Sequence, residues 1–187
     1  MNEIELIRAQ LSLERQHAAD VSRACASAFA ATNSCTGDRL ASLEAFRHAG
    51  VDYLIYILTR FEEREQVLRE LFHSRFAEGL NREAADSALA LTGSSREALA
   101  KLEIAMGSSS DADSAAHWTE FLRFFTDVWS PRRDELDKLF EQQAKVTDWR
   151  AVSGIDADSI YDERRRYAHM RAKLPAGIEM PATRSSL

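Results

Sequence analysis

The sequence predicts an all-α protein: an up-down-up-down four-helix bundle over residues 1–146, followed by a C-terminal helical extension over residues 147–187. The 187 residues include only 7 glycines and 3 prolines, fewer than a fold of many short strands needs for its turns. Apolar residues recur at intervals of three and four positions, the spacing of one helix face. Short polar breaks separate four long segments of this kind, and such segments pack most simply as antiparallel neighbours.

The first two helices are expected over residues 2–32 and 38–76. One face of the first carries the apolar positions Ile4, Ile7, Leu11, Ala18, Val21, Cys25 and Ala28. Cap and turn residues at positions 33–37 end it. The second is unusually long, so we expect a bend near Gly50. Its apolar stripe includes one charged residue, Glu65, among Leu54, Leu58, Phe61, Leu68 and Phe72.

Two shorter helices are expected next. Residues 82–91 follow a cap residue, and residues 94–106 begin at the capping box formed by Ser94 and Glu97. A long helix then runs from Ser110 or Asp111 to about Val146 and completes the bundle.

The long helix is apolar around much of its circumference, through Trp118, Phe121, Phe124, Phe125 and Trp129. Such a helix is either central or in contact with another chain, so we expect these rings in the core and at a subunit interface. A pocket for a planar ligand is the functional alternative. Pro131 follows Ser130 and indicates a restart or a kink of this helix.

The extension is expected to contain one helix from Asp156 to Leu174, stopped by Pro175. We expect little contribution to the core from the last dozen residues. A small basic patch lies at Arg164–Arg166, and four acids nearly cancel it: Asp156, Asp158, Asp162 and Glu163. This pattern predicts a solvated helix and not a nucleic-acid surface.

Charge and composition exclude several classes of protein. A net charge of −6 is opposite to that of most nucleic-acid binders. The acidic N-terminus does not resemble a secretory signal, and no apolar run reaches the length of a membrane span. Cys25 and Cys35 fit neither a disulfide scaffold nor a zinc motif, so we expect free thiols and a cytoplasmic protein. No nucleophile or phosphate-loop signature is present, and no enzymatic activity is predicted.

Bundle proteins build their sites from polar side chains on the inward stripes. His17, Glu65 and Glu135 fall on such stripes. At 1.5 Å rise per residue, antiparallel helices with matched ends would bring these three residues to one level near the middle of the bundle. Imidazole and carboxylate groups are suitable ligands for a transition metal.

The pattern of Leu13–His17 in the first helix, with Phe61–Glu65 and Pro131–Glu135 in later helices, resembles the hemerythrin-like (HHE cation-binding) family. This resemblance implies a four-helix bundle that binds non-haem iron and senses or handles oxygen or redox changes. Its ligand positions match here at His17, Glu65 and Glu135. Two family histidines are replaced by Phe61 and Pro131, so the resemblance implies a reduced or lost site.

The same residues equally fit a protein without a cofactor. An isolated buried carboxylate is costly, so Arg132 could neutralise Glu65 or Glu135, with His17 completing the hydrogen bonds of a polar cluster. The chain would then be a metal-free interaction or regulatory module. It would form a homo-oligomer or bind a protein partner through its aromatic helix or its C-terminal extension, without nucleic acid or membrane.

Overall fold

The computed structural model describes residues 2–32, 34–73, 86, 90, 93–107, 111–142, 144–154 and 156–180. These residues form helices and their connections, with no strand among them, which confirms the all-α class. The helix expected over residues 82–91 lies almost entirely outside the described residues. Across the part of the chain described, no helix combines the length and the apolar character needed to cross a membrane.

Helices α1 (Glu3–Thr32) and α2 (Asp38–Leu71) form the long hairpin that the sequence predicts. At the start of α1, the Asn2 side chain accepts the Glu5 N–H at 2.9 Å, and the Glu5 carboxylate accepts the Asn2 N–H at 2.7 Å. This reciprocal cap satisfies donors that the first turn leaves unpaired. Helix α2 continues through Gly50, where a bend had been expected.

Gly50 instead lets the two helices approach closely. A Cβ atom added at this position would collide with Sγ of Cys25 and would lie 3.4 Å from a methyl group of Val21. Cys25 and Val21 are fully buried on the facing surface of α1. The glycine therefore serves helix–helix packing.

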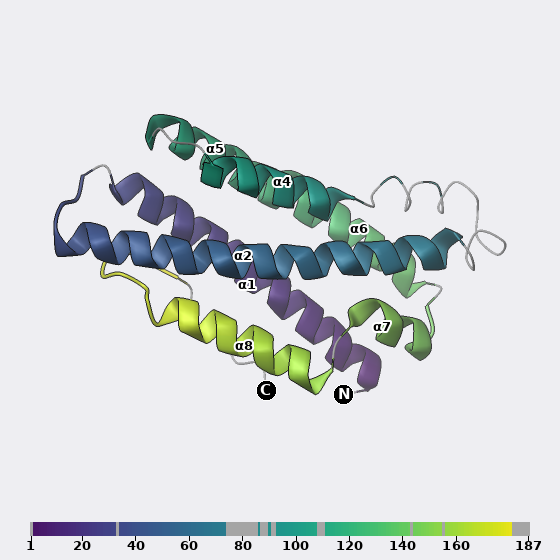
Figure 1. Ribbon diagram of the computed structural model, residues 1–187. Coiled ribbons are helices and arrows are strands. Elements are labelled where there is room, and N and C mark those ends of the chain that lie inside the picture. Colours follow the sequence, from purple (N-terminus) through teal and green to yellow (C-terminus); the bar gives the residue numbers. More distant parts are fainter. Residues whose placement is uncertain are drawn as a thin grey trace.

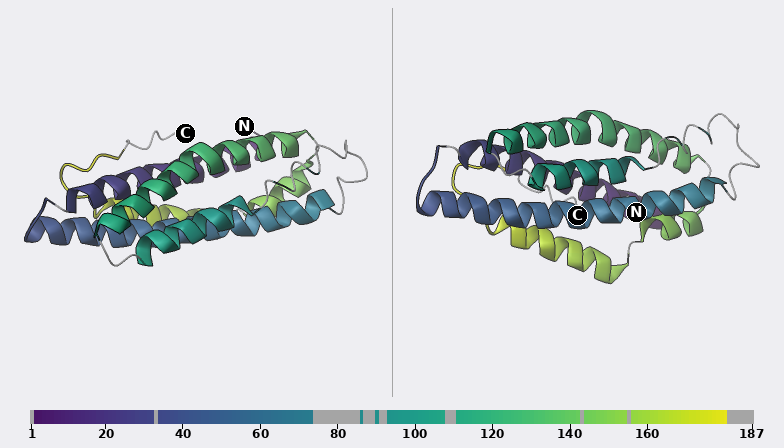
Figure 2. Two further views of the ribbon diagram at one scale, coloured as in Figure 1. Left: turned by 90° about the horizontal axis from the view of Figure 1, so that it is seen from above. Right: turned by 45° about the horizontal axis from the view of Figure 1, so that its top comes forward.

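The next helices are α4 (Ser94–Gly107) and α5 (Asp111–Arg123). A π-helical segment, η2 (Phe124–Trp129), and α6 (Ser130–Glu141) continue the path of α5. Figure 2 shows α5, η2 and α6 as one run along the molecule. Pro131 lies in the first turn of α6, directly after the π-helical segment, and the helical path continues through it.

Helices α7 (Val146–Ser153) and α8 (Ala157–Arg171) make up the C-terminal extension. The sequence pattern predicted α8 but missed α7, and it placed the end of the preceding helix near Val146 where α6 ends at Glu141. Asp148 caps α7 by accepting the Lys145 N–H at 2.9 Å. Asp156 caps α8 by accepting the Ser159 N–H at 2.7 Å.

The helices pack as a bundle around α2. Helices α4 and α5 lie on one side of α2 in Figure 1, while α7 and α8 lie on the other, and α1 and α6 both cross behind it. Close contacts join α1 to α2, α2 to α4, α4 to α5 and α1 to α5. Helices α7 and α8 each pack against both α1 and α2. The extension thus covers the outside of the hairpin.

Two hydrophobic clusters fill the interior. The larger cluster contains Val21, Leu54, Phe61, Trp129 and Met170, among others. The smaller cluster, at the opposite end of α1 and α2, contains Leu11, Leu68, Leu136, Phe140 and Trp149, among others. Helix α8 contributes to the larger cluster and α7 to the smaller. Ile178 and Met180, beyond α8, also pack on the larger cluster, although the sequence predicted little core contribution from this stretch.

Candidate functional site

A buried polar layer separates the two hydrophobic clusters. Along α1 it falls between Leu11 and Ala18, along α2 between Phe61 and Leu68, and along η2 and α6 between Trp129 and Leu136. The buried side chains of the polar layer are Glu14, Arg64, Glu65, Ser95 and Arg133, and the partly buried Asp137 lies next to them on α6. The sequence predicted polar groups at this level, and the structure shows that arginines occupy much of it.

Arg64 joins α2 to α1 and α7. One guanidinium nitrogen, Nη1, donates to Glu14 Oε2 at 2.6 Å, and Nε donates to the Ser153 carbonyl at 2.6 Å. Both charged side chains are buried, with Arg64 4% exposed and Glu14 fully enclosed. Burial lowers the pKa of Arg64, while the nearby Glu14 carboxylate opposes that shift. The pair thus satisfies two charges that would be costly alone.

Glu65 binds the first turn of α4. Its carboxylate accepts the N–H groups of Gly93 at 2.9 Å and Ser95 at 3.2 Å, together with the Ser95 hydroxyl at 2.7 Å. The Ser94 hydroxyl donates at 3.3 Å, and the Trp129 indole N–H donates to the Ser95 hydroxyl at 2.9 Å. A carboxylate at this position satisfies unpaired donors and interacts favourably with the positive end of the helix dipole.

Arg133 extends the polar layer toward the surface. Its Nη1 lies 4.0 Å from Glu65, and its Nε lies 3.2 Å from Asp137. Asp137 also pairs with Arg15 of α1, and Arg15 lies 3.7 Å from the exposed Asp134. A continuous series of alternating charges therefore runs from the core to solvent.

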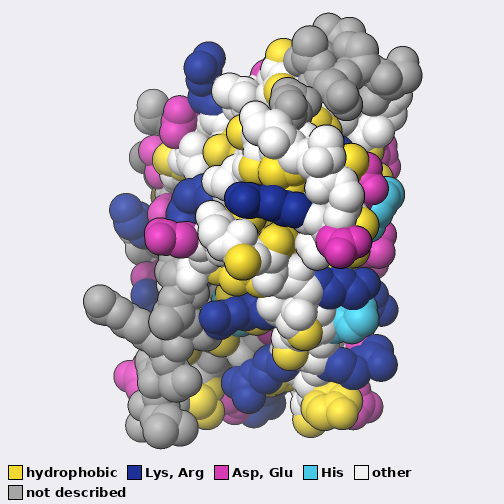
Figure 3. Space-filling model, turned by 90° about the vertical axis from the view of Figure 1, so that its left-hand side faces the viewer, with side chains coloured by type: hydrophobic (Ala, Val, Ile, Leu, Met, Phe, Trp, Pro, Cys, Tyr) yellow, Lys and Arg dark blue, Asp and Glu magenta, His cyan; other side chains and the backbone are white. Residues whose placement is uncertain are grey.

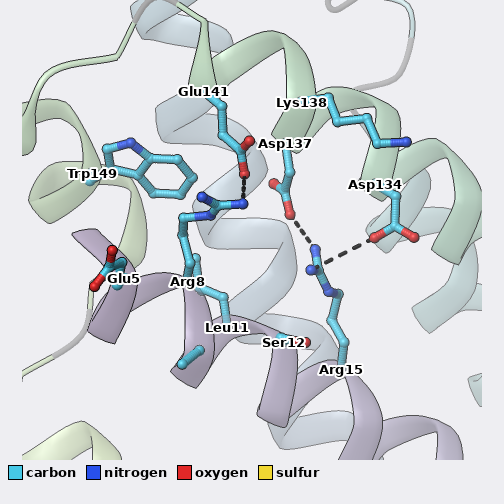
Figure 4. Close-up of a pocket in the computed structure, with 11 residues that line it drawn as sticks. Glu5, Arg8, Leu11, Ser12, Arg15, Asp134, Asp137, Lys138, Glu141 and Trp149 are labelled. Carbon is cyan, nitrogen blue, oxygen red and sulfur yellow. Dashed lines mark hydrogen bonds and ion pairs between the residues drawn. The ribbon is translucent and has the colours of Figure 1, made fainter. Parts of the chain in front are cut away.

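That series ends in a cleft of about 490 Å³ between α1 and α6, which Figure 4 shows. Arg8 and Arg15 reach across the α1–α6 cleft to Glu141 and Asp137, and the Trp149 ring closes one end. The carboxylates of this cleft are thus largely engaged by arginines of the same chain.

His17 belongs to a second buried network, on the side of α8. Its Nδ1 lies 2.9 Å from Glu163 Oε1, and the same oxygen accepts the Tyr53 hydroxyl at 2.7 Å. The imidazole stacks on Tyr167, with ring centroids 3.6 Å apart and planes inclined by 8°. Burial, reinforced by Glu163, raises the pKa of Tyr53 well above its usual value. This network joins α8 to α1 and α2.

The three predicted site residues therefore have different surroundings. His17 pairs with Glu163, Glu65 binds the start of α4, and Glu135 is exposed on α6. No group of three or more histidine, cysteine or acidic side chains is placed to hold a metal ion, as far as the described ranges extend. The structure does not bring the predicted ligands together, and metal binding by them stays a prediction.

The π-helical segment explains why Glu135, which was expected to face the interior, and Arg132 both face solvent. The Ser130 N–H bonds to the Phe125 carbonyl, five residues back, so this turn holds more residues than an α-helical turn. In an uninterrupted α-helix the face of Phe125 would pass through Val128, Arg132 and Glu135, and this is the stripe on which Glu135 was expected. With the π turn it passes through Trp129 and Arg133. Arg132 is exposed, and Arg133 is the buried arginine that the predicted polar cluster required.

Sequence reasoning also missed Arg64 and Glu163, although both lie on predicted apolar stripes. Arg64 is three residues after Phe61 and four before Leu68, and Glu163 is four residues before Tyr167. This spacing is a usable signal for a charged residue that faces the core. Arg133 carries a similar signal, four residues after Trp129 and three before Leu136, but Arg132 and Glu135 lie on a competing stripe that continues from Phe125 in an uninterrupted α-helix. The π-helical turn decides between the two.

The aromatic rings of α5 and η2 pack in the interior of the protein. Phe125 and Trp129 stack with centroids 4.8 Å apart, Trp129 lies 5.0 Å from Phe61, and Trp118 lies 5.9 Å from Phe29. All five rings of the predicted aromatic face are at most 8% exposed. They therefore form core, as the sequence predicted in part, and present no open aromatic surface to a partner.

Comparison with known proteins completes the description of the site. No family model matches this chain, and no curated protein or solved structure shows significant similarity to it.

Proposed function

We propose that this protein is a metal-free helical scaffold with regulatory or interaction functions, built on a hemerythrin-like up-down-up-down bundle. The observation that carries the proposal is the pairing of Arg64 with Glu14 and of Glu65 with the start of α4. Carboxylates at the level of the expected metal are engaged by protein donors.

The charge of the polar layer favours this function over iron binding. Arg64 and Arg133 are buried, and guanidinium groups retain their charge at all physiological pH values. A divalent cation brought to this level would be repelled by both groups and would have to displace them from Glu14 and Asp137. The remaining predicted ligand, Glu135, points to solvent from α6.

The C-terminal extension supports the interaction part of the proposal. Helix α8 is attached to the bundle by buried groups on one face, while Tyr161 on another face is 70% exposed. Tyrosine is enriched in the cores of protein–protein interfaces relative to the rest of the surface. We propose that α8 contacts a second copy of the chain or a protein partner, in the cytoplasm, where Cys25 and Cys35 remain free thiols.

Metal analysis of protein purified without oxygen tests the proposal. We expect iron well below one ion per chain, no ligand-field or charge-transfer absorption, and no change in either on His17→Ala or Glu65→Ala. Stoichiometric iron that is lost in both variants would overturn it and would support the family function implied by the sequence.

Light scattering tests the interaction part. We expect an assembly larger than one chain, weakened by Tyr161→Ser and unaffected by Ile104→Ser, because Ile104 is an exposed apolar residue on α4, on the other side of α2 from α8 (Figure 1). A monomer at all concentrations would contradict self-association.

A further inference from the structure

A cleft between α2 and α8 differs in character from the α1–α6 cleft. It has a volume of about 500 Å³ and is lined by Ala49, Asp52, Tyr53, Arg165, Arg166 and His169. This volume is within the range of small-molecule sites. We propose that the α2–α8 cleft binds a small organic anion, a phosphate monoester or a carboxylate that also carries a hydroxyl or amine group.

The basic wall of the cleft is not neutralised as the sequence suggested. Of the four acids near Arg164–Arg166, Glu163 points inward and binds His17 and Tyr53 in the core. Asp156 caps the opposite end of α8, and Asp158 lies near that end, about 10 Å along the axis from Arg165 at 1.5 Å per residue. The C-terminal half of the helix is therefore more basic than the sequence count indicates.

One acid, Asp162, remains beside the arginines, and Arg165 and Arg166 share its carboxylate. Its carboxylate accepts Arg165 Nη2 at 2.7 Å and Arg166 Nε at 2.9 Å. These bonds, that from Arg166 foremost, lower the pKa of Asp162 to about 2, so one negative charge faces two guanidinium groups. Figure 3 shows the end of the molecule that lies on the left in Figure 1, and on its lower half Lys and Arg side chains gather with a histidine.

The spacing of the hydrogen-bond donors suits an oxyanion. Arg165 and His169 are one turn apart on α8, so their side chains are neighbours on one helix face. Arg165 is 64% exposed, which leaves donors of its planar fork accessible to a phosphate or carboxylate. Arg166 is held in place between Asp162 and the Tyr56 ring, whose centroid lies 4.4 Å from the guanidinium carbon.

The α2 side of the cleft supplies complementary chemistry. The Tyr53 ring is 2% exposed, and its hydroxyl is fixed on Glu163, so it provides a rigid wall. Asp52 is exposed beside it on α2 and can accept a hydrogen bond from a hydroxyl or amine of the ligand. Binding at this cleft requires neither the buried ion pairs nor a partner protein, so it can fail or succeed independently of the proposed scaffold function.

Titration calorimetry of the full chain with glycerol phosphate, inorganic phosphate and glycerol tests the proposal. We expect saturable one-to-one binding of glycerol phosphate, weaker binding of inorganic phosphate and none of glycerol. Arg165→Gln and His169→Gln should each weaken glycerol phosphate binding by about fivefold or more, because each removes a direct donor to the anion.

Two matched variants separate a built site from general electrostatic attraction. Arg164→Gln removes the same charge from an exposed neighbour that does not line the cleft, and its binding should stay within about twofold of the parent chain. Asp52→Ala removes the acceptor for a ligand hydroxyl, so it should narrow the preference for glycerol phosphate over inorganic phosphate. The proposal would be overturned if binding did not saturate by about 10 mM of either phosphate, near the weak end of useful ligand affinities. Equal losses of glycerol phosphate affinity in Arg164→Gln and Arg165→Gln would also overturn it.

Discussion

Glu65 and Ser95 join two helices through two hydrogen bonds, because the Ser95 N–H and hydroxyl both donate to the Glu65 carboxylate, at 3.2 and 2.7 Å. The Trp129 indole N–H donates to the same hydroxyl at 2.9 Å. A side chain of α2 thus caps α4 across the bundle. Glu65, which the sequence predicted to be a metal ligand, thus holds α2 and α4 together. Its replacement therefore distinguishes the metal-binding hypothesis from the metal-free scaffold hypothesis.

Glu65→Ala should lower the free energy of unfolding by about 2–4 kcal/mol, because it leaves the Gly93 and Ser95 N–H groups buried or half-buried without their acceptor. Urea denaturation measures this change. The matched variant is Glu135→Ala, which removes an exposed carboxylate and should change stability by no more than about 0.5 kcal/mol. Similar large losses in both variants would contradict the assigned roles.

Tyr53→Phe should destabilise the protein by about 1–3 kcal/mol, since the buried Glu163 loses one of its two donors at Oε1. Tyr56→Phe is the control, because Tyr56 lies three residues along α2 and is only partly buried. Thermal unfolding followed by circular dichroism compares the two. If the Tyr56 variant were the less stable, the His17–Glu163–Tyr53 network would not be what attaches α8.

Gly50→Ala should cost about 1–3 kcal/mol, because the added methyl group meets Cys25 Sγ in a fully packed interface. The double variant with Cys25→Ala should recover part of that loss, and a double-mutant cycle quantifies the coupling. Gly107→Ala is the neutral control, since open space surrounds the position of its Cβ. Strict additivity of the Gly50 and Cys25 changes would argue against the close approach.

Cys25 should be unreactive in the folded protein, whereas Cys35, which is only partly buried, should react with a thiol reagent at pH 8. Burial raises the pKa of Cys25 to about 12, and the thiolate is the reactive form. In urea both thiols should react. Equal rates for the two thiols in the folded state would contradict this assignment.

The same shift predicts alkaline destabilisation. The unfolded chain releases the Cys25 proton near its ordinary pKa of about 8.5, while the folded chain retains it to about 12. The unfolded state therefore binds fewer protons above pH 8.5, and stability falls as pH rises through this window. Cys25→Ser or Cys25→Ala should flatten that part of the pH–stability profile, measured by urea denaturation between pH 8 and 10.

Deleting Asp127 from the π-helical segment should be tolerated far better than deleting Glu135 from α6. The π turn contains a surplus residue, so its removal restores an α-helical turn and leaves Trp129 and Arg133 facing inward. Without such a surplus in α6, removing Glu135 rotates Leu136 and Phe140 by about 100° away from the core. Expression and melting temperature compare the two deletions, and equal damage would contradict the register explanation.

Much of the architecture was predictable because it follows from local periodicity. The long hairpin, the helix after Ser94 and the helix after Asp156 are confirmed, and the level of the polar layer follows from helix rise alone. The burial of His17 and Glu65 could also be read from their positions on apolar stripes. Helix α7 was missed because its 8 residues are too few for a clear period.

The sequence by itself thus determined the helical class, the extents of most helices and the presence of polar groups in mid-bundle. Only the tertiary structure decided how those groups pair, because the partners are remote in the chain: Glu65 and Ser95 are 30 residues apart, and His17 and Glu163 are 146 apart. It also decided that Arg133, and not Arg132 or Glu135, faces inward. That choice follows from a π-helical turn whose Trp129 ring stacks on Phe61 of another helix, and periodicity within one segment does not encode such a contact.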